Sequence, residues 1–221
     1  MTTSKIYTKK GDDGTTGLFS GKRVNKHNIR IKTCGNLDEL NVWIGMIRNF
    51  KMDKNTQNTL ITIQQELMSI AAQLSDHRAY EVSKKKHTLK PTDKNNVIFL
   101  ENQIDLISKE LPELKNFVIP GGHSIISHTH LARCSCRKVE RLISELKDKE
   151  SVPNLIIAYI NRLSDYLFTL ARKFTYDMDV SEIKWISKKK IGVLCCLIPL
   201  KIYFCTNFYT YVLDIRTCIL P

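Results

Sequence analysis

The sequence comprises 221 residues, of which 43% are hydrophobic and 25% are charged. These proportions are ordinary for a globular protein, and 9 glycines and 6 prolines exclude a collagen-like or low-complexity chain. Lysine and arginine outnumber aspartate and glutamate by 34 to 22, which favours an anionic partner such as nucleic acid, acidic lipid or a polyphosphate. The length suggests one domain, or two at most.

The cysteines and the N-terminus bear on the compartment. The 7 cysteines are an odd number with no disulfide-like spacing, which is typical of a reduced, intracellular protein. The first residues contain no apolar signal region and no amphipathic targeting segment, so the sequence predicts a cytoplasmic protein. A protein of the mitochondrial matrix whose N-terminus is truncated would look the same.

Residues 1–35 are polar and punctuated by glycine, and we predict an N-terminal arm there in place of a core element. Glycines in this arm let the backbone turn several N–H groups toward one anion, with Lys9 and Lys10 adding charge and Thr15 and Thr16 adding hydroxyl donors. This is the chemistry of a phosphate cradle, although the Walker A pattern is absent. A flexible polar terminus is the alternative interpretation.

Residues 36–185 contain five segments with helical periodicity and no segment with strand periodicity. The first begins at Asn36 as N-cap, with Glu39 placed as in a capping box. The others span about 56–75, from Thr92 or Asp93 to about 111, about 124–147 and about 153–174. The pattern predicts an all-α protein built as a five-helix bundle.

The fourth segment carries Arg133, Arg137 and Arg141 on one face. The outer two Cα atoms of such a stripe lie about 12 Å apart, long enough to follow a triphosphate, which arginine binds bidentately. A solvated helix face is the alternative. Asn161 and its neighbours lie on the polar side of the last segment, where they could equally be plain surface. His123, His128 and His130 do not match a metal-binding spacing, so no metal site is predicted.

Residues 186–221 form an apolar tail with little charge and no helix or strand period. A membrane anchor is disfavoured because Lys201 and Pro199 divide the apolar run. A packed pair of strands is a second interpretation, and translated non-coding sequence is the one we favour. We assign no function to this tail and expect it to lie outside the fold.

Five blocks of the sequence resemble one family in order and spacing, the PduO-type ATP:cob(I)alamin adenosyltransferases. They are KIYTKKGDDGTT (5–16), GNLDELN (35–41), FVIPGG (117–122), ARCSCRKVER (132–141) and YINRLSDYLF (159–168). The resemblance implies a trimer of five-helix bundles that binds ATP and cobalamin at subunit interfaces. It also implies transfer of the 5′-deoxyadenosyl group of ATP to cob(I)alamin, with release of triphosphate.

The same resemblance assigns residue roles. It implies that the N-terminal arm wraps the triphosphate with Mg²⁺, that Asp38 and Arg133 form a catalytically important pair across a subunit boundary, and that Phe117 displaces the lower axial ligand of the corrinoid. It implies that the residues lining ATP are Thr8, Lys9, Lys10, Gly11, Thr16, Gly17, Lys26, Arg137, Lys138, Glu140, Arg141 and Asn161. An adenosylcobalamin-dependent mutase would be a suitable partner.

The chain departs from the family pattern in the arm, where the family usually has threonine at Lys10 and lysine at Asp13. Which side chain contacts phosphate therefore stays open. Two other functions stay open as well. One is a basic helical module that binds RNA, although interleaved aromatic residues for base stacking are lacking. The other is a family member that delivers corrinoid without catalysing transfer. Neither nucleic acid nor a membrane is our expected partner.

Overall fold

The computed structural model describes residues 7–18, 21–75 and 90–186. The chain divides into two units, Met1–Trp185 and Ile186–Pro221, and the account below concerns the first. Apart from Ile186, the apolar tail lies outside the described residues, and so do the three interpretations of it.

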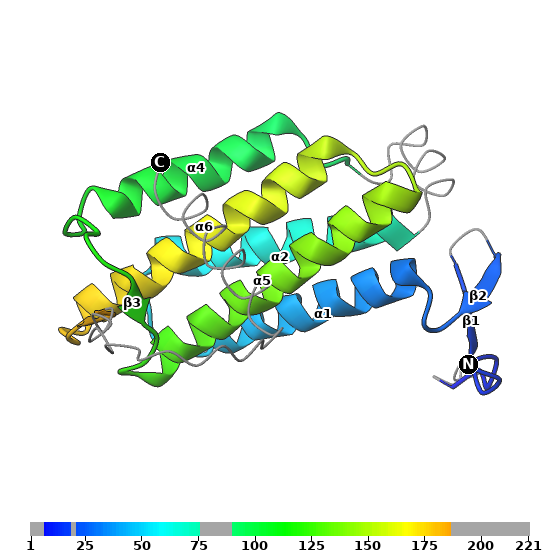
Figure 1. Ribbon diagram of the computed structural model, residues 1–221, viewed down its shortest axis with the longest axis horizontal. Coiled ribbons are helices and arrows are strands. Elements are labelled where there is room, and N and C mark those ends of the chain that lie inside the picture. The colour runs from blue at the N-terminus through cyan, green and yellow to red at the C-terminus, as the bar shows by residue number, and fades with distance from the viewer. Residues whose placement is uncertain (1–6, 19–20, 76–89, 187–221) are drawn as a thin grey trace, which may run out of the picture. The chain divides into compact units, whose positions relative to one another are not determined.

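The described residues form five helices: α1 (Ile29–Arg48), α2 (Lys54–Ser75), α4 (Lys94–Ser108), α5 (Ser124–Lys149) and α6 (Asn154–Asp177) (Figure 1). Two antiparallel ribbons accompany them. Strand β1 (Thr15–Gly17) pairs with β2 (Arg23–Asn25), and β3 (Val118–Ile119) pairs with β4 (Ile183–Lys184). The predicted all-α bundle is confirmed. Strands of two or three residues are too short to show a two-residue period.

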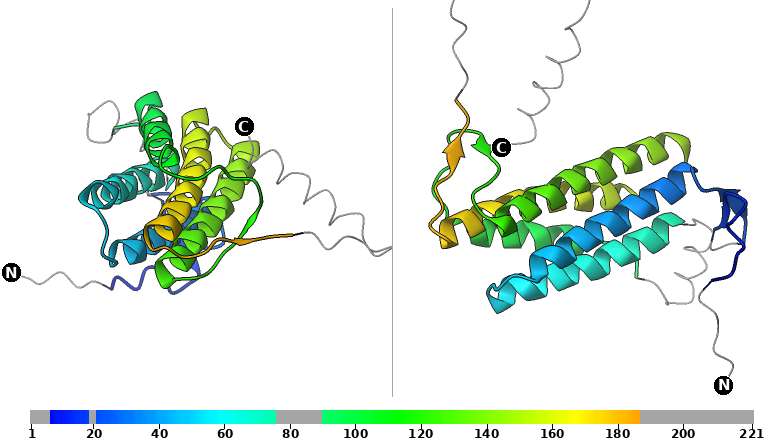
Figure 2. Two further views of the ribbon diagram at one scale, coloured as in Figure 1. Left: turned by 90° about the vertical axis from the view of Figure 1, so that its left-hand side faces the viewer. Right: turned by 90° about the horizontal axis from the view of Figure 1, so that it is seen from below.

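The helices lie side by side, with α1 against α2 and α5, α5 against α6, and α6 against α4 (Figure 2). Helices α1 and α5 run antiparallel, because each end of one meets the opposite end of the other. Arg30 at the start of α1 donates from Nε to Glu150 after α5 over 2.9 Å. At the other end, the Phe50 ring that follows α1 lies 5.7 Å from the His128 ring.

The first helix begins earlier than predicted. Asn28 is its N-cap, and the Asn28 side chain accepts a hydrogen bond from the Arg30 backbone N–H over 2.9 Å. Asn36 was therefore wrong as the cap: it lies inside α1 and donates to the Lys32 carbonyl over 2.7 Å. Thr33 and Leu37 are buried, so packing of this turn outweighs the intrinsic cost of Gly35 in a helix.

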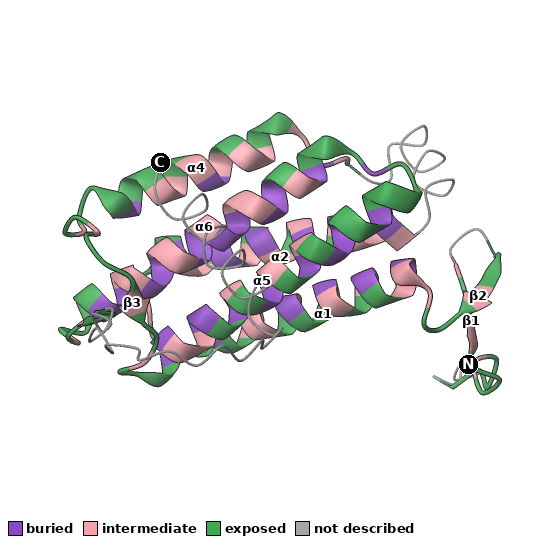
Figure 3. Cartoon of the chain, in the orientation of Figure 1, coloured by how far each residue is buried: buried purple, intermediate pink, exposed green. Residues whose placement is uncertain are grey.

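The core fills the space between the helices, and each helix turns its buried residues toward it (Figure 3). Helix α1 contributes Leu37, Leu40, Ile44 and Ile47, the stripe that helical spacing predicts for this segment. Helical spacing predicts that Leu131, Ser135, Val139, Leu142 and Leu146 form the buried stripe of α5, but Leu131 is 46% exposed. The neighbouring positions Ala132 and Cys136 are buried instead, since α5 packs against α1 on one side and α6 on the other. Among the described residues, no helix combines the length and the apolar character needed to cross a membrane.

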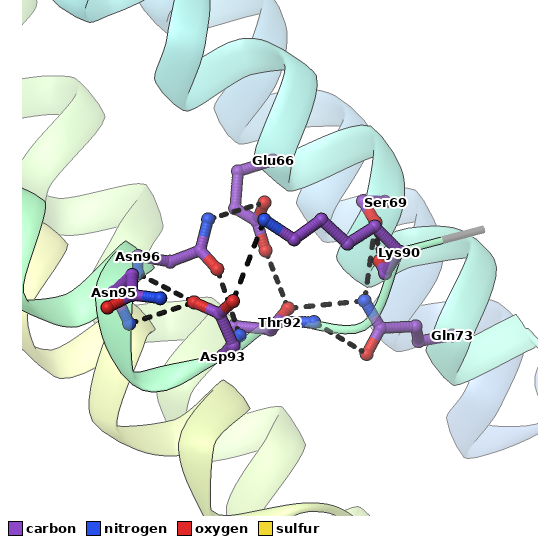
Figure 4. Close-up of polar contacts among 8 residues, drawn as sticks. All are labelled: Glu66, Ser69, Gln73, Lys90, Thr92, Asp93, Asn95 and Asn96. Carbon is purple, nitrogen blue, oxygen red and sulfur yellow. Dashed lines mark hydrogen bonds and ion pairs between the residues drawn. The ribbon is translucent and has the colours of Figure 1, made fainter. Parts of the chain in front are cut away.

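A polar network fastens the start of α4 to α2 (Figure 4). The Thr92 hydroxyl donates to Glu66 over 2.6 Å, and the Asn96 amide donates to the other Glu66 oxygen over 3.0 Å. Burial raises the pKa of Glu66, although the Thr92 hydrogen bond opposes this effect. Asp93 caps α4 in a capping box with Asn96, which confirms the predicted start of this helix.

We predict that the two candidate caps of α1 differ in their contribution to stability. Asn28→Ala removes the acceptor of the Arg30 N–H and should lower the free energy of unfolding by about 1 kcal/mol. Asn36→Ala should change it by less than about 0.5 kcal/mol, because alanine is the better helix former at an interior position. Urea denaturation followed by circular dichroism, at one protein concentration, measures both. Equal losses in the two variants would contradict the assignment of the cap.

Candidate functional site

The N-terminal arm folds into a turn followed by the β1–β2 hairpin, and it brings two predicted site residues together. A Cβ placed on Gly11 would lie 3.4 Å from the Lys26 ammonium and 3.3 Å from the Thr15 carbonyl, so the chain passes close by at this glycine. Lys9 has a left-handed φ of 55°, which is uncommon for a residue with a side chain. Thr8, Lys9 and Lys10 are exposed beside this turn. The arm therefore presents lysine ammonium groups and a tight backbone turn, both of which can bind an anion.

The second cluster lies where α5 meets α6. The Asn161 amide of α6 donates to Glu140 of α5 over 2.9 Å, and Lys138 of α5 forms an ion pair with Glu39 of α1 over 3.2 Å. The guanidinium groups of Arg137 and Arg141 make no hydrogen bond or ion pair with the described residues. Arginines without a protein partner beside a fixed Glu–Asn pair are suited to an anionic ligand.

The structure adds a polar contact that the sequence left open. Arg162 forms ion pairs with Asp165 over 2.7 Å and with Glu101 of α4 over 3.2 Å. Burial raises the pKa of Asp165, although the positive charge of Arg162 opposes it. The polar side of α6 is thus packed against α4 and α5 instead of being plain surface. Helical spacing indicated this face, but its partners are distant in sequence.

Phe117 stands at the edge of the β3–β4 ribbon and is 41% exposed. Its carbonyl accepts from the Trp185 N–H over 2.8 Å, and the two rings meet edge to face with centroids 6.1 Å apart. Gly122 has φ +94° and lies so close to Val180 that a Cβ would come within 2.5 Å of it. The turn from β3 into α5 therefore requires glycine at position 122. A cavity of about 30 Å³, lined in part by His130, lies beside β3 and β4.

The three histidines considered for a metal site have separate structural roles. His123 caps α5 by accepting from the Ile125 N–H over 3.3 Å. His128 packs against Phe50 and Trp43, and His130 lies near Phe168. In the part of the chain that the structure describes, no three histidine, cysteine, aspartate or glutamate residues are grouped to hold a metal ion.

One chain does not bring all the predicted site residues together. Asp38 and Arg133 make no ion pair with each other, and the buried Arg133 Nε has no partner among the described residues. Phe117 precedes α5, whereas the arm joins the N-terminus of α1, which lies beside the C-terminus of α5. The 20 residues of α1 span about 30 Å, so Phe117 and the arm join opposite ends of the helices.

These features define an all-α bundle with a row of arginines on one polar face and a basic, glycine-containing arm. The sequence model of the family described as cobalamin adenosyltransferase matches residues 6–174. The chain therefore belongs to the cobalamin adenosyltransferase family.

Two curated relatives and a solved structure illustrate the likeness. The corrinoid adenosyltransferase of Bacillus subtilis is 35% identical over 185 residues, which cover 82% of this chain and 92% of that protein. The corrinoid adenosyltransferase PduO of Salmonella typhimurium is 35% identical over 188 residues, and the match spans 85% of this chain but 55% of that relative. A variant of the PduO-type ATP:corrinoid adenosyltransferase from Lactobacillus reuteri, complexed with cobalamin and ATP, superposes with a TM-score of 0.74. It is 31% identical and covers 83% of this chain and 100% of its own.

We predict that protonation of His130 weakens the fold in mild acid. Burial, aided by the positive charge of Arg133, lowers the pKa of His130 from 6.5 to about 4. Between these values the unfolded chain binds more protons, so the stability is fully present above pH 6.5 and falls as the pH drops toward 4. The contribution of His130 to this loss should be about 1–3 kcal/mol.

Urea denaturation at neutral pH and near pH 4 measures the effect. His130→Gln should show a smaller pH-dependent loss than the wild type, because the group that gains a proton is gone. The exposed His27→Gln serves as a control and should retain the full loss. An unchanged pH dependence in His130→Gln would show that other groups are responsible.

Proposed function

We propose that the protein transfers the 5′-deoxyadenosyl group of ATP to cob(I)alamin, giving adenosylcobalamin and triphosphate. The observation that carries the proposal is the α5–α6 cluster, in which Arg137 and Arg141 form no hydrogen bond or ion pair with the described residues beside the Glu140–Asn161 pair. Membership of the family and the cobalamin and ATP bound in the Lactobacillus reuteri relative support it.

The ATP site is assigned to two parts of the chain. In the arm, we assign the triphosphate to the turn at Gly11 and to the cationic groups around it, of which Lys26 lies beside the glycine. In the bundle, we assign phosphate binding to Arg137 and Arg141, with Glu140 and Asn161 holding other parts of the nucleotide. Arginine binds phosphate oxygens bidentately, and residues four apart lie on one face of a helix, so both side chains can reach the same triphosphate. The remaining assigned residues are Thr8, Lys9, Lys10, Thr16, Gly17 and Lys138.

The reaction requires alignment more than it requires a protein nucleophile. An electron pair of cobalt(I) forms the bond to C5′ of ATP, and the C5′–O bond breaks with its pair leaving on triphosphate. The protein must hold the two substrates in line, and its arginines must stabilise the charge that develops on the departing oxygens. An apolar Phe117 ring at the lower face of the corrinoid would exclude water and the lower ligand, which favours the four-coordinate cobalt that is easier to reduce.

Mg²⁺ fits this site as a companion of the nucleotide. Magnesium is commonly held by substrate phosphates with one or two carboxylates and several waters, not by an all-protein cage. The Asp12 carboxylate is exposed in the arm and is the kind of single ligand that such an arrangement uses. Asp12 is the residue we assign to the ion, whose charge would offset part of the charge of the triphosphate.

We further propose a homotrimer with the active sites between subunits. Asp38 on α1 and Arg133 on α5 form no ion pair with each other within the described part of the chain, where the buried Arg133 Nε also has no hydrogen-bond partner. Val42 and Leu131 are large apolar residues exposed on the same two helices. A neighbouring subunit could cover them, pair Asp38 with Arg133, and unite the Phe117 end of one bundle with the arm of the next.

The product suggests where the protein works. Adenosylcobalamin is the radical cofactor of mutases, and such an enzyme is the partner we propose for the product. We place the protein inside the cell, in the cytoplasm or in the mitochondrial matrix.

An assay of adenosylcobalamin formation from ATP and chemically reduced cobalamin tests the proposal, using chains that end at Trp185 and at Pro221. Product formation supports it, and formation by the shorter chain alone would show that the tail interferes. Binding of both substrates without product would indicate corrinoid delivery. Binding of RNA with no affinity for ATP would overturn the proposal.

We predict that Arg137→Ala weakens ATP binding and leaves the fold intact. Loss of one charge-assisted contact to phosphate should cost about 1.5–3 kcal/mol of binding free energy. Isothermal titration with ATP measures the loss, and circular dichroism checks the helices. Lys147→Ala, which removes the same charge from an exposed position farther along α5, should bind ATP like the wild type. An equal effect of both substitutions would mean that only net charge matters.

We predict that Phe117→Ala slows adenosyl transfer by orders of magnitude while ATP affinity stays nearly constant, because no phosphate contact is lost. The spectrum of bound cob(II)alamin should also lose its four-coordinate signature. Tyr176→Ala, which removes another exposed aromatic ring at the end of α6, should alter neither property. A Phe117→Ala variant that keeps both the rate and the spectrum would place the corrinoid elsewhere.

A further inference from the structure

Arg23 of β2 is outside the set of residues assigned to ATP, yet it holds the phosphate-binding arm at several points. Its guanidinium donates to the Lys10 carbonyl, to the Asp13 carboxylate over 3.1 Å and, through Nε, to the Thr15 hydroxyl over 2.9 Å. Asp13 in turn accepts from the Thr15 N–H over 3.0 Å and from the Thr15 hydroxyl over 2.8 Å. Both ends of residues 10–15 are therefore tied to one side chain.

The contacts of Arg23 coincide with an unfavourable backbone conformation. Lys9 has φ 55°, and a left-handed residue with a side chain persists only where its surroundings enforce it. The Lys10 carbonyl, which follows directly, accepts from Arg23. The Arg23 guanidinium thus fixes the chain next to the strained residue. The hydrogen bonds from Thr15 lower the pKa of Asp13, which keeps its carboxylate charged.

We propose that Arg23 and Asp13 are a positioning pair that holds residues 9–15 in the conformation that receives the triphosphate, without contacting it themselves. This inference rests on the proposed function. The pair is electrically neutral, so the attraction for phosphate comes from Lys9, Lys10, Lys26 and the backbone. The family pattern has lysine at position 13. Aspartate at this position removes that positive charge, but its hydrogen bonds order the loop of residues 10–15.

A different role for Asp13 makes the opposite prediction. Its carboxylate accepts from the Thr15 N–H and hydroxyl and from Arg23, which are donors that a phosphate oxygen could also use. If ATP had to displace Asp13, then Asp13→Asn would bind ATP more tightly than the wild type. A positioning pair predicts weaker binding.

The test uses the full chain with Arg23→Gln, Asp13→Asn, the double variant and Arg23→Lys, with Lys22→Gln as the control. Lys22 is exposed, adjacent in sequence and of equal charge. Each single variant should raise the dissociation constant and the KM for ATP about tenfold, as expected for loss of a charge-assisted network. The double variant should lose no more than the worse single variant. Arg23→Lys should fail to restore binding, because an ammonium cannot span the three acceptors.

The KM for cobalamin should stay unchanged throughout, and Lys22→Gln should bind ATP within about twofold of the wild type, as for a screened surface charge. Additive losses, unchanged ATP affinity in Asp13→Asn, or tighter binding would each overturn the positioning role. Amide hydrogen exchange of residues 10–15 without ATP gives an independent readout and should be faster in both single variants. If the wild type binds no ATP, both the proposed function and the positioning pair fail. If the wild type binds ATP but amide exchange of residues 10–15 is the same in all variants, only the positioning pair is overturned.

Discussion

The packing of α5 between α1 and α6 is the constraint on which the rest of the site depends. Ala132 and Cys136 are fully buried because each side of α5 needs an apolar surface against a neighbour. Only the remaining side of the helix is open to polar groups, and the arginines at positions 133, 137 and 141 occupy it. Residues four apart lie on one face of a helix, so the arginines form a single row. Because two sides of α5 are buried against neighbouring helices, this row occupies the side that stays polar. The core thus determines which face of α5 carries the row of arginines.

The same packing explains what the sequence could and could not predict. A stripe such as Leu37, Leu40 and Ile44 repeats at helical spacing, so the existence of each helix was predictable. A helix with two buried sides has no single stripe, which is why Leu131 was assigned to the core although it is exposed. The start of α1 was missed for a related reason. Gly35 resembles a boundary locally, but the burial of Thr33 shows that tertiary contacts extend the helix to Asn28.

The candidate site divides in the same way between local and long-range information. The arm and the arginine stripe were identifiable because glycines, lysines and arginines at short spacing have a local meaning. The Glu140–Asn161 hydrogen bond and the Lys138–Glu39 ion pair join different helices, so no local pattern contains them. Arg23 was overlooked because a lone arginine in a basic arm looks like one more surface charge. Only its three acceptors in the loop distinguish it from Lys22.

Many charged side chains of this protein are paired with one another. The net charge of +12 therefore does not indicate how many cations are available to bind a ligand. Arg23 and Arg162 are engaged with carboxylates, so they organise the protein more than they attract a ligand. Arg137 and Arg141 have no such partner among the described residues, and Lys26 faces a glycine that leaves room beside it. An anion gains most from cations that need not give up a protein contact to bind it, because breaking a charge-assisted pair offsets the new contact. Among the described residues these unpaired cations are fewer than the total charge suggests, which is why we assign the triphosphate to them.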